Sequence, residues 1–245
     1  RRVLFRSRAE VAAAGADLGI GFDGDGDRIG IIDGKGRQVP GDLLTAFLAK
    51  DVAARHPGAP ILLDVKSSEA ALRLVESAGA AAQIWKTGHS HMKKRMKELE
   101  APLAGEMSGH IFIADNYLGF DDAIYAAVRV ITQMVKGGQS ITEFMDSLPE
   151  QHATPELRID CPDTVKFDSM ERIRAHVLSG HDAADVNSID GVRVRSGDGW
   201  WLIRASNTEA ALVARAEAAD RTALDRLLCD IETTLAAAGL DWKRP

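Results

Sequence analysis

Between residues 40 and 146, short apolar runs alternate with longer segments in which apolar residues recur every three or four positions. The short runs are typical of buried strands, and the longer periodicity is typical of amphipathic helices. Alternation of the two at this spacing predicts a mixed or parallel sheet covered by helices, an α/β fold. The predicted strands are 61–65, 82–85, 103–104 and 111–113, and the predicted helices are 43–54, 70–77, 91–99, 121–135 and a last one opening at a capping box, 140–143.

The segment before residue 40 has a different pattern. A helix end at 9–15 is followed by a short buried strand at 18–22 and a second strand at 28–32, with a Gly/Asp loop between them. Residues 1–7 begin without Met and show neither helical nor strand periodicity. We interpret them as a truncation edge or a cloning or sequencing scar and exclude them from the fold.

The pattern changes again after a candidate linker at 149–155, which carries two prolines. Tight Gly-containing turns between the following β segments predict antiparallel pairing. We therefore predict three parts: 1–37, the end of one domain; 38–150, the α/β domain; and 151–245, a smaller α+β C-terminal domain. The elements predicted in the last part are strands at 157–159, 185–189, 192–195, 200–204 and 210–216, and helices at 170–178 and 222–238.

Composition limits the partners and the compartment. The 245 residues carry a formal net charge of -6, without the basic surplus of a typical nucleic-acid-binding domain, and no apolar run approaches the ~20 residues of a membrane span. Cys161 and Cys229 lie far apart and in no metal-like spacing, which favours a reducing cytoplasm over a disulfide scaffold. We predict a cytoplasmic globular protein that binds neither nucleic acid nor membranes.

The motif DGDGDR at residues 23–28 gives the sharpest chemical signal. Its carboxylates, Asp23, Asp25 and Asp27, occupy every second position between two predicted strands, and the glycines let the backbone turn tightly enough for them to converge. Converging carboxylates repel one another unless a cation lies among them. An all-oxygen ligand set selects a hard ion, Mg²⁺ or Ca²⁺.

This motif has two alternative interpretations besides a metal site. An EF-hand calcium loop starting at Asp23 fails by position, because its sixth residue should be Gly and is Arg28, and its twelfth should be Glu and is Gly34. An acidic hairpin turn is the other, since Asp-Gly is a common turn dipeptide. Three Asp steps in register favour the metal site over such a turn.

Two loops combine polar groups in patterns that suit an anionic or polyhydroxyl ligand. Residues 86–90, KTGHS, present Lys86 and His89 at a predicted helix N-terminus, where free N–H groups attract anions, although a capped surface turn fits equally well. Residues 105–110, GEMSGH, place a carboxylate, a hydroxyl and an imidazole between glycines. The alternative for this second loop is a β-turn with polar tips.

Residues 204–208, RASNT, form a third candidate loop between two predicted strands. An Arg fork with neighbouring hydroxyl and amide donors, and with Arg215 further along, suits a phosphate dianion better than a plain polar hairpin loop does. Lys66 follows the strand at 61–65, at the end where parallel sheets bind ligands, although a lone lysine is more often solvated. The basic run at 93–95 is interpreted as a solvated helix face.

These loops, in this order and spacing, resemble the phosphohexomutase superfamily, and most closely its bacterial phosphomannomutase/phosphoglucomutase branch. In that family four domains surround a deep cleft, and each gives it one loop. The resemblance implies the tail of domain two followed by complete domains three and four. It also implies a partner, the N-terminal half of the same enzyme, because the family's phosphoserine loop is absent from this sequence. A chain with the metal site and no nucleophile should not turn over alone.

The resemblance further implies an activity and a role for each loop. The activity is an intramolecular phosphate transfer that interconverts hexose 1-phosphate and hexose 6-phosphate, of mannose or glucose, through a phosphoserine and a hexose 1,6-bisphosphate. The implied Mg²⁺ ligands are Asp23, Asp25 and Asp27; the implied catalytic residues are Arg28, Lys66, His89 and His110; and the implied substrate-binding residues are Lys86, Glu106, Ser108, Arg204, Ser206, Asn207, Thr208 and Arg215.

Several alternatives stay open at this point. Phosphoglucosamine mutases usually have Gln where this chain has Met107, and a Ser-Gly-Thr loop where it has Ser206, Asn207 and Thr208, so both positions point away from that branch. A non-catalytic module that binds a metal or a sugar phosphate is a further possibility. The preference for mannose or glucose, and the choice between His89 and Lys66 as the general acid/base, are not decided by the sequence.

Overall fold

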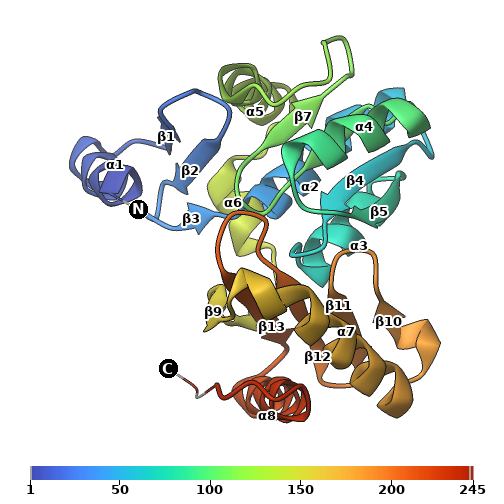
Figure 1. Cartoon of the computed structure of the whole chain (residues 1–245). Helices are drawn as coiled ribbons and strands as arrows, with labels where there is room; N and C mark the ends of the chain where they lie inside the picture. The colour runs from blue at the N-terminus through green and yellow to red at the C-terminus, as the bar shows by residue number, and fades with distance from the viewer. Residues whose placement is uncertain (1, 243, 245) are drawn as a thin grey trace. The chain divides into compact units, whose positions relative to one another are not determined.

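The chain folds into two compact units that divide between Pro149 and Glu150, in a computed structural model that describes residues 2–242 and 244 (Figure 1). The boundary falls at the start of the predicted linker. That linker is partly structured, because β8 (His152–Ala153) pairs with a strand of the second unit. The predicted division at residue 37 is not a boundary between these units, and it stays a prediction.

A small antiparallel sheet opens the first unit, formed by β1 (Leu18–Phe22), β2 (Ile29–Asp33) and β3 (Gln38–Val39) in that order. The turn that joins β1 to β2 is the DGDGDR loop, so the predicted placement of that motif between two strands is confirmed. The strand prediction at 18–22 is correct in its bounds but wrong in its burial, since β1 is only partly buried.

Helix α1 (Arg2–Ala14) packs against β1 and β2. The interpretation of residues 1–7 as lying outside the fold is therefore wrong for 2–7, while Arg1 lies outside the described residues. Gly19 explains the close approach of helix and sheet, because a Cβ atom at this position would lie 2.5 Å from Val11 Cγ2. A sequence without clean periodicity forms a helix here because tertiary packing outweighs local preference.

We predict that this small sheet is the least stable part of the first unit. Strand β1 is an edge strand, and Phe22 at its end is 40% exposed, whereas Ile61, Leu62 and Leu63 of the central strand in the larger sheet are fully buried. Edge backbone with few buried contacts opens at low free-energy cost. Amide hydrogen exchange in residues 18–22 should be faster than in 61–63, and equal or slower exchange in 18–22 would contradict the prediction.

The larger sheet of the first unit confirms the predicted α/β fold. Three of its strands are parallel, in the order β5-β4-β6, and β7 pairs antiparallel with β6. Each predicted strand is present within one or two residues of its expected bounds. The strands are β4 (Pro60–Asp64), β5 (Ala81–Trp85), β6 (Leu103–Gly105) and β7 (Ile111–Ile113).

Helices cover both faces of this sheet because the central strand is apolar on both sides. Ile61 and Leu63 pack into one core with α2 (Gly41–Arg55), α3 (Glu69–Ser77), α5 (Ala123–Gly137) and α6 (Ile141–Asp146), while Leu62 faces α4 (His89–Leu99). The predicted capping box is confirmed, with Ser140 and Glu143 each accepting from the other's backbone N–H. Together these layers hold the loops at the carboxyl edge of the sheet on a rigid frame.

A buried charge network ties α2 to α5 beside this core. Asp115, whose side chain is 1% exposed, accepts from Arg129 Nη2 at 2.8 Å, contacts His56 Nε2 at 2.9 Å and pairs with Arg55. Asp51 accepts from both arginines. Burial opposes the ionised form of Asp115, but the hydrogen bonds from Arg55, His56 and Arg129 hold its pKa well below its usual range. Hydrogen bonding from Arg55 likewise lowers the pKa of Asp51.

Because both folded-state pKa values lie below that of an unfolded Asp, about 3.9, the network stabilises the fold above that pH and loses its effect as the pH falls. Asp115→Asn should lower the free energy of unfolding by about 2 kcal/mol at pH 7, because Arg129 and the partly exposed Arg55 lose their charge-assisted hydrogen bonds to this buried carboxylate. Urea denaturation should show the gap between the two proteins shrinking from pH 5 to about pH 3. A constant gap between pH 7 and pH 3 would contradict this assignment.

The second unit is the predicted α+β domain with an antiparallel sheet. Its strands run in the order β10-β11-β12-β13-β8, with β9 also paired to β13. Two helices pack on one face of this sheet around a core that includes Trp201 and Ile203. The elements are β9 (Leu157–Asp160), α7 (Asp163–Gly180), a 3₁₀ turn η1 (Ala183–Asp185), β10 (Val186–Asn187), β11 (Val192–Ser196), β12 (Gly199–Ala205), β13 (Ala211–Ala218) and α8 (Arg221–Ala237).

Two predicted bounds in this unit need correction. Helix α7 begins at Asp163 instead of residue 170, because its first turns expose Val165 and Phe167 and so lack the apolar face that the pattern required. The strand predicted at 185–189 is only Val186–Asn187, because the 3₁₀ turn takes up Asp185.

Both cysteines are free, with Cys161 buried and Cys229 exposed. In the part of the chain that the structure describes, no helix has both the length and the apolar character needed to cross a membrane.

Candidate functional site

Three loops of the first unit lie at one edge of the larger sheet, because β4, β5 and β6 run parallel and end there. Lys66 follows β4, Lys86 follows β5, and Glu106 follows β6. Carboxyl ends of parallel strands are where α/β folds bind their ligands. The structure therefore brings together the first two sugar- or anion-binding loops predicted from the sequence, and it adds Lys66 to them.

Asp64, the last residue of β4, links these loops, and sequence reasoning missed it. Its side chain is fully buried and accepts from Ser67 Oγ at 2.8 Å, Thr87 Oγ1 at 3.1 Å and the Met107 backbone N–H at 3.1 Å. Lys66 Nζ lies 3.8 Å from its carboxylate. One buried acceptor thus holds donors from the loops after all three parallel strands. Its position at the carboxyl end of an apolar strand was the available signal.

The loop at 105–110 is wedged in place by glycines at both ends. A Cβ at Gly105 would lie 1.8 Å from Thr45 Oγ1, and one at Gly109, where φ is +102°, would lie 2.5 Å from Ile29 O. Gly41, at the start of α2, also touches this loop, since a Cβ atom added at this position would lie 2.2 Å from Glu106 O. The loop backbone is consequently fixed by steric contact with α2 and β2.

Glu106 and Ser108 form one hydrogen-bonded pair within this loop. Glu106 is 3% exposed; its Oε1 accepts from the Gly88 N–H at 2.8 Å, and its Oε2 accepts from Ser108 Oγ at 3.2 Å. Burial, together with the negative charge of Asp64, raises the pKa of Glu106 above its usual value. The pair presents carboxylate lone pairs and a hydroxyl side by side, which suits the adjacent hydroxyl groups of a sugar.

The predicted metal loop converges as expected. One carboxylate oxygen from each of Asp23, Asp25 and Asp27 lies within 4.8 Å of the others. Arg28 closes the loop, because its Nε donates to Asp23 Oδ2 at 2.6 Å and its backbone N–H donates to Asp23 Oδ1 at 3.1 Å. Burial raises the pKa of Asp23, but these hydrogen bonds and the charge of Arg28 outweigh it and lower the pKa to about 2.

Asp27 provides the structural test of whether a cation fits here. Burial and the neighbouring carboxylates raise its pKa, although His110 opposes this, and its buried Oδ1 has no hydrogen-bond partner among the described residues. An acceptor oxygen in this state gains from a positive charge placed against it. The donor set is all oxygen and therefore fits a hard divalent cation such as Mg²⁺.

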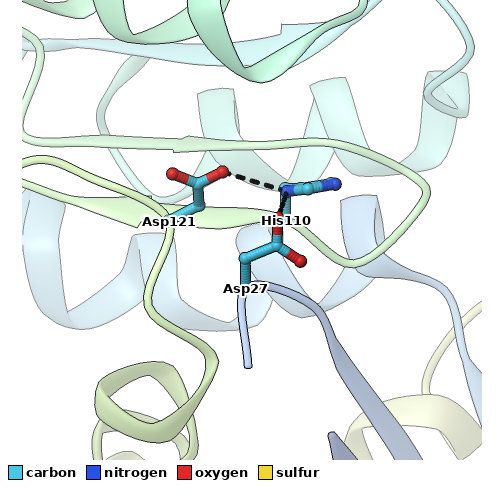
Figure 2. A group of neighbouring side chains, drawn as sticks. All are labelled: Asp27, His110 and Asp121. Carbon is cyan, nitrogen blue, oxygen red and sulfur yellow. Dashed lines mark hydrogen bonds and ion pairs between the residues drawn. The ribbon is translucent and has the colours of Figure 1, made fainter. Parts of the chain in front are cut away.

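His110 links the DGDGDR loop to the loop at 105–110. Its backbone forms an isolated bridge with Arg28, and Ile29 N–H donates to Gly109 O at 3.0 Å. Figure 2 shows the Nδ1 atom of His110 facing the carboxylates of Asp121 and Asp27, at 3.1 Å and 3.7 Å. Sequence reasoning missed Asp121, which it took as the first residue of the helix predicted at 121–135; the helix begins at Ala123.

The interpretation of the basic run at 93–95 as a solvated helix face is wrong for Lys93. Its Nζ lies 2.9 Å from Asp121 Oδ1 and 3.2 Å from His89 Nδ1. His89 is at the start of α4, one helical turn before Lys93, and its ring stacks against that of His110. The spacing of four residues between a histidine and a lysine was the available signal. Lys86 is exposed at the same sheet edge.

The second unit presents the predicted phosphate-binding loop between β12 and β13. Arg204, at 5% exposure, donates from Nε to Asp190 Oδ2 at 3.1 Å. Its Nη2 is buried without a hydrogen-bond partner among the described residues. Arg215 shares a face of the sheet with Arg204, because Arg215 pairs with Leu202 and Arg204 pairs with Val213 in the antiparallel register. The two guanidinium groups therefore project to the same side.

Lys166, which sequence reasoning also missed, holds the backbone of this loop through hydrogen bonds. Its Nζ donates to the carbonyl oxygens of Ser206 and Glu209, both at 3.0 Å, and its side chain is buried. Ser206 Oγ accepts from the Glu209 N–H at 3.1 Å, which closes the turn. Asn207 and Thr208 are exposed at its tip. A rigid turn thus presents hydroxyl, amide and guanidinium donors together.

Comparison with known proteins gives a family for both units. Residues 40–152 match the family model described as phosphoglucomutase/phosphomannomutase, alpha/beta/alpha domain III, and residues 156–233 match phosphoglucomutase/phosphomannomutase, C-terminal domain. The phosphomannomutase/phosphoglucomutase of Pseudomonas putida is 44% identical over 219 residues, which are 89% of this chain and 47% of that protein. The chain thus spans about half the length of the curated relatives that it matches.

Solved structures agree. A phosphoglucomutase/phosphomannomutase family protein from Burkholderia thailandensis superposes with a TM-score of 0.88 at 36% identity, over 97% of this chain and 51% of that one. An Aspergillus fumigatus N-acetylphosphoglucosamine mutase, in complex with GlcNAc-6P and magnesium, has the same fold at a TM-score of 0.62 and 17% identity, over 90% of this chain and 48% of that one. The chain belongs to the phosphoglucomutase/phosphomannomutase family, of which it contains domain III and the C-terminal domain.

Proposed function

We propose that this chain supplies the metal-, sugar- and phosphate-binding parts of a mutase that interconverts hexose 1-phosphate and hexose 6-phosphate, with mannose or glucose as the sugar. The reaction proceeds through a phosphoserine and a hexose 1,6-bisphosphate. The chain acts with the N-terminal half of such an enzyme, whose end is residues 1–37 of this chain. The convergence of Asp23, Asp25 and Asp27 beside His110 carries the proposal.

Each group of residues has a defined task in this proposal. Glu106 and Ser108 bind two adjacent sugar hydroxyls, and Lys86 stands at the same sheet edge to attract the anionic substrate. The loop at 204–208, with Arg215, holds the phosphate that is not being transferred. Either phosphate of the bisphosphate can be the one that is not being transferred. The sugar must therefore bind in two orientations, one for each phosphate.

Proton transfer and charge neutralisation belong to the first unit. Asp23, Asp25 and Asp27, with Arg28 beside them, would hold Mg²⁺, and the ion would supply positive charge against the phosphate being transferred. Lys66, His89 and His110 are the groups that hold or move the hydroxyl proton. Magnesium in the distant Aspergillus structure supports the choice of ion.

A chimera tests this function. The half of the Pseudomonas putida relative that this chain does not span would be joined to this chain, and conversion of mannose 1-phosphate and glucose 1-phosphate would be assayed with Mg²⁺. We expect turnover by the chimera, none by this chain alone, and none by a chimera carrying Asp25→Ala.

The controls separate folding from function. Circular dichroism and thermal unfolding establish that each chimera is folded. A folded chimera that binds Mg²⁺ and hexose phosphate without converting either would favour a non-catalytic binding module. Conversion of glucosamine phosphate alone would favour a phosphoglucosamine mutase.

A further inference from the structure

Two histidines lie side by side at the edge of the candidate site but have opposite surroundings. The rings of His89 and His110 stack with centroids 6.1 Å apart and an interplanar angle of 22°. His89 comes from the start of α4, and His110 comes from the end of the sugar-binding loop. A neutral imidazole has one N–H donor and one lone-pair acceptor, and the partner of one nitrogen decides which role is left to the other.

The Nδ1 atom of His110 faces two carboxylate acceptors. Asp121 Oδ2 lies 3.1 Å away and Asp27 Oδ2 lies 3.7 Å away, as Figure 2 shows. Asp121 is 7% exposed at its side chain, and hydrogen bonding from Lys93, opposing the effect of burial, lowers its pKa, so it is an ionised acceptor. An antiparallel bridge between Phe112 and Asp121 fixes its backbone. In the neutral ring, Nδ1 of His110 must therefore carry the hydrogen, which leaves Nε2 as the lone-pair atom.

The Nδ1 atom of His89 has a donor as its nearest partner. Lys93 Nζ lies 3.2 Å away, and an ammonium group has no lone pair with which to accept. Asp121 Oδ2 is also in the vicinity, but at 3.6 Å it is beyond hydrogen-bond distance and already accepts from His110. Nδ1 of His89 must therefore be the lone-pair atom, which places the hydrogen on Nε2.

We infer that Asp121 and Lys93 are positioning residues that set His89 and His110 in opposite tautomers. The same Lys93 ammonium binds Asp121 Oδ1 at 2.9 Å, so one ion pair orients both rings. His89 then presents an Nε2–H donor, and His110 presents an Nε2 acceptor.

The consequence for catalysis rests on the proposed function. A site that transfers phosphate to a sugar hydroxyl needs a group that accepts the hydroxyl proton and a donor for the developing charge. The tautomer pair supplies both at neutral charge, with His110 as the acceptor and His89 as the donor. Neither Asp121 nor Lys93 needs to touch the substrate for this.

Nitrogen-15 NMR of the histidine side chains tests the inference directly. Spectra of the labelled chain would be recorded near pH 8.5, well above the pKa of a free imidazole, and the nitrogen that carries the hydrogen would be identified in each neutral ring. His89→Asn and His110→Asn variants assign the two signals among the seven histidines. We expect His110 to be protonated mainly on Nδ1, and His89 mainly on Nε2.

Variants of the positioning residues should change this pattern selectively. In Asp121→Ala, the major tautomer of His110 should switch to Nε2–H. In Lys93→Met, the Nδ1–H fraction of His89 should rise, because Asp121 becomes its nearest partner. Asp122→Ala removes the neighbouring carboxylate, which caps α5 without contacting either ring, and Lys94→Met removes the neighbouring exposed lysine; neither should change the tautomers.

Two results would overturn the inference: the same major tautomer for both rings in the unaltered chain, or an unchanged His110 signal in Asp121→Ala. The spectra are recorded without substrate, so an inactive chimera leaves this result untouched. Active chimeras with equal tautomers would refute the inference and keep the proposed function.

Discussion

Asp25→Ala should weaken Mg²⁺ binding by about 100-fold or more while leaving the fold unchanged. Removing even an outer-shell partner of a metal ligand typically costs 10- to 100-fold in affinity, and we propose Asp25 as a direct ligand because its carboxylate converges with those of Asp23 and Asp27. Its side chain is exposed, unlike that of Asp23, which is hydrogen-bonded to Arg28. Loss of Asp25 also removes a negative charge beside Asp27 and so lowers the attraction for any cation.

Isothermal titration of the chain with MgCl₂ measures this effect. Asp17→Ala is the matched control, because Asp17 is an exposed carboxylate just before β1 and outside the loop. We expect the control to bind like the unaltered chain, and both variants to unfold at the same temperature as it does. Equal Mg²⁺ affinity in Asp25→Ala and Asp17→Ala would show that these carboxylates do not form a metal site.

Gly41→Ala should destabilise the first unit by about 1–3 kcal/mol, the usual cost of overpacking a tight contact. The new Cβ would lie 2.2 Å from Glu106 O and 2.7 Å from Gly109 N, and both are backbone atoms that cannot rotate away. An alanine near a helix start is otherwise neutral or favourable relative to glycine. Whether Gly41→Ala stabilises or destabilises the unit therefore depends on its contact with the loop at 105–110.

Urea denaturation of Gly41→Ala beside Gly180→Ala isolates that contact. Gly180 ends helix α7, and a Cβ there would have no heavy atom within 4 Å, so we expect its replacement to be neutral or slightly stabilising. Hexose phosphate affinity should also fall in Gly41→Ala, because the displaced backbone holds Glu106. A Gly41→Ala protein as stable as the unaltered chain would mean that the loop is free to move.

Much of the fold follows from local pattern. The strand at 61–65 and the helix at 43–54 were predictable because an apolar run and a helical period are properties of short segments. Helix α1 was not predictable, because it is stabilised by packing against the sheet instead of by a periodic apolar face. The first turns of α7 were not predictable either, because they are exposed and show no helical period. Burial of β1 was overestimated for the same reason, since the amount of cover over a strand is a tertiary property.

The site divides in the same way. Glu106 and the carboxylates of the DGDGDR motif were predictable as site residues, because they lie in distinctive local sequences between glycines. Asp64, Asp121 and Lys166 were missed because each binds a partner that is distant in sequence. Asp64 accepts from Met107 N–H, Asp121 accepts from Lys93, and Lys166 donates to the carbonyl oxygen of Ser206. Such partners are decided by which loops the fold places together, and a single sequence does not reveal that placement.

The central claim, that this chain itself holds a hexose phosphate through these loops, is tested most directly by calorimetry. Mg²⁺-saturated chain would be titrated with mannose 1-phosphate, alongside Arg204→Ala and the matched control Arg195→Ala, which removes an exposed arginine of β11. Charge-assisted hydrogen bonds of about 1.5–3 kcal/mol predict binding at least tenfold weaker in Arg204→Ala and unchanged in Arg195→Ala. Equal affinity in all three proteins, or no binding by the unaltered chain, would contradict the account.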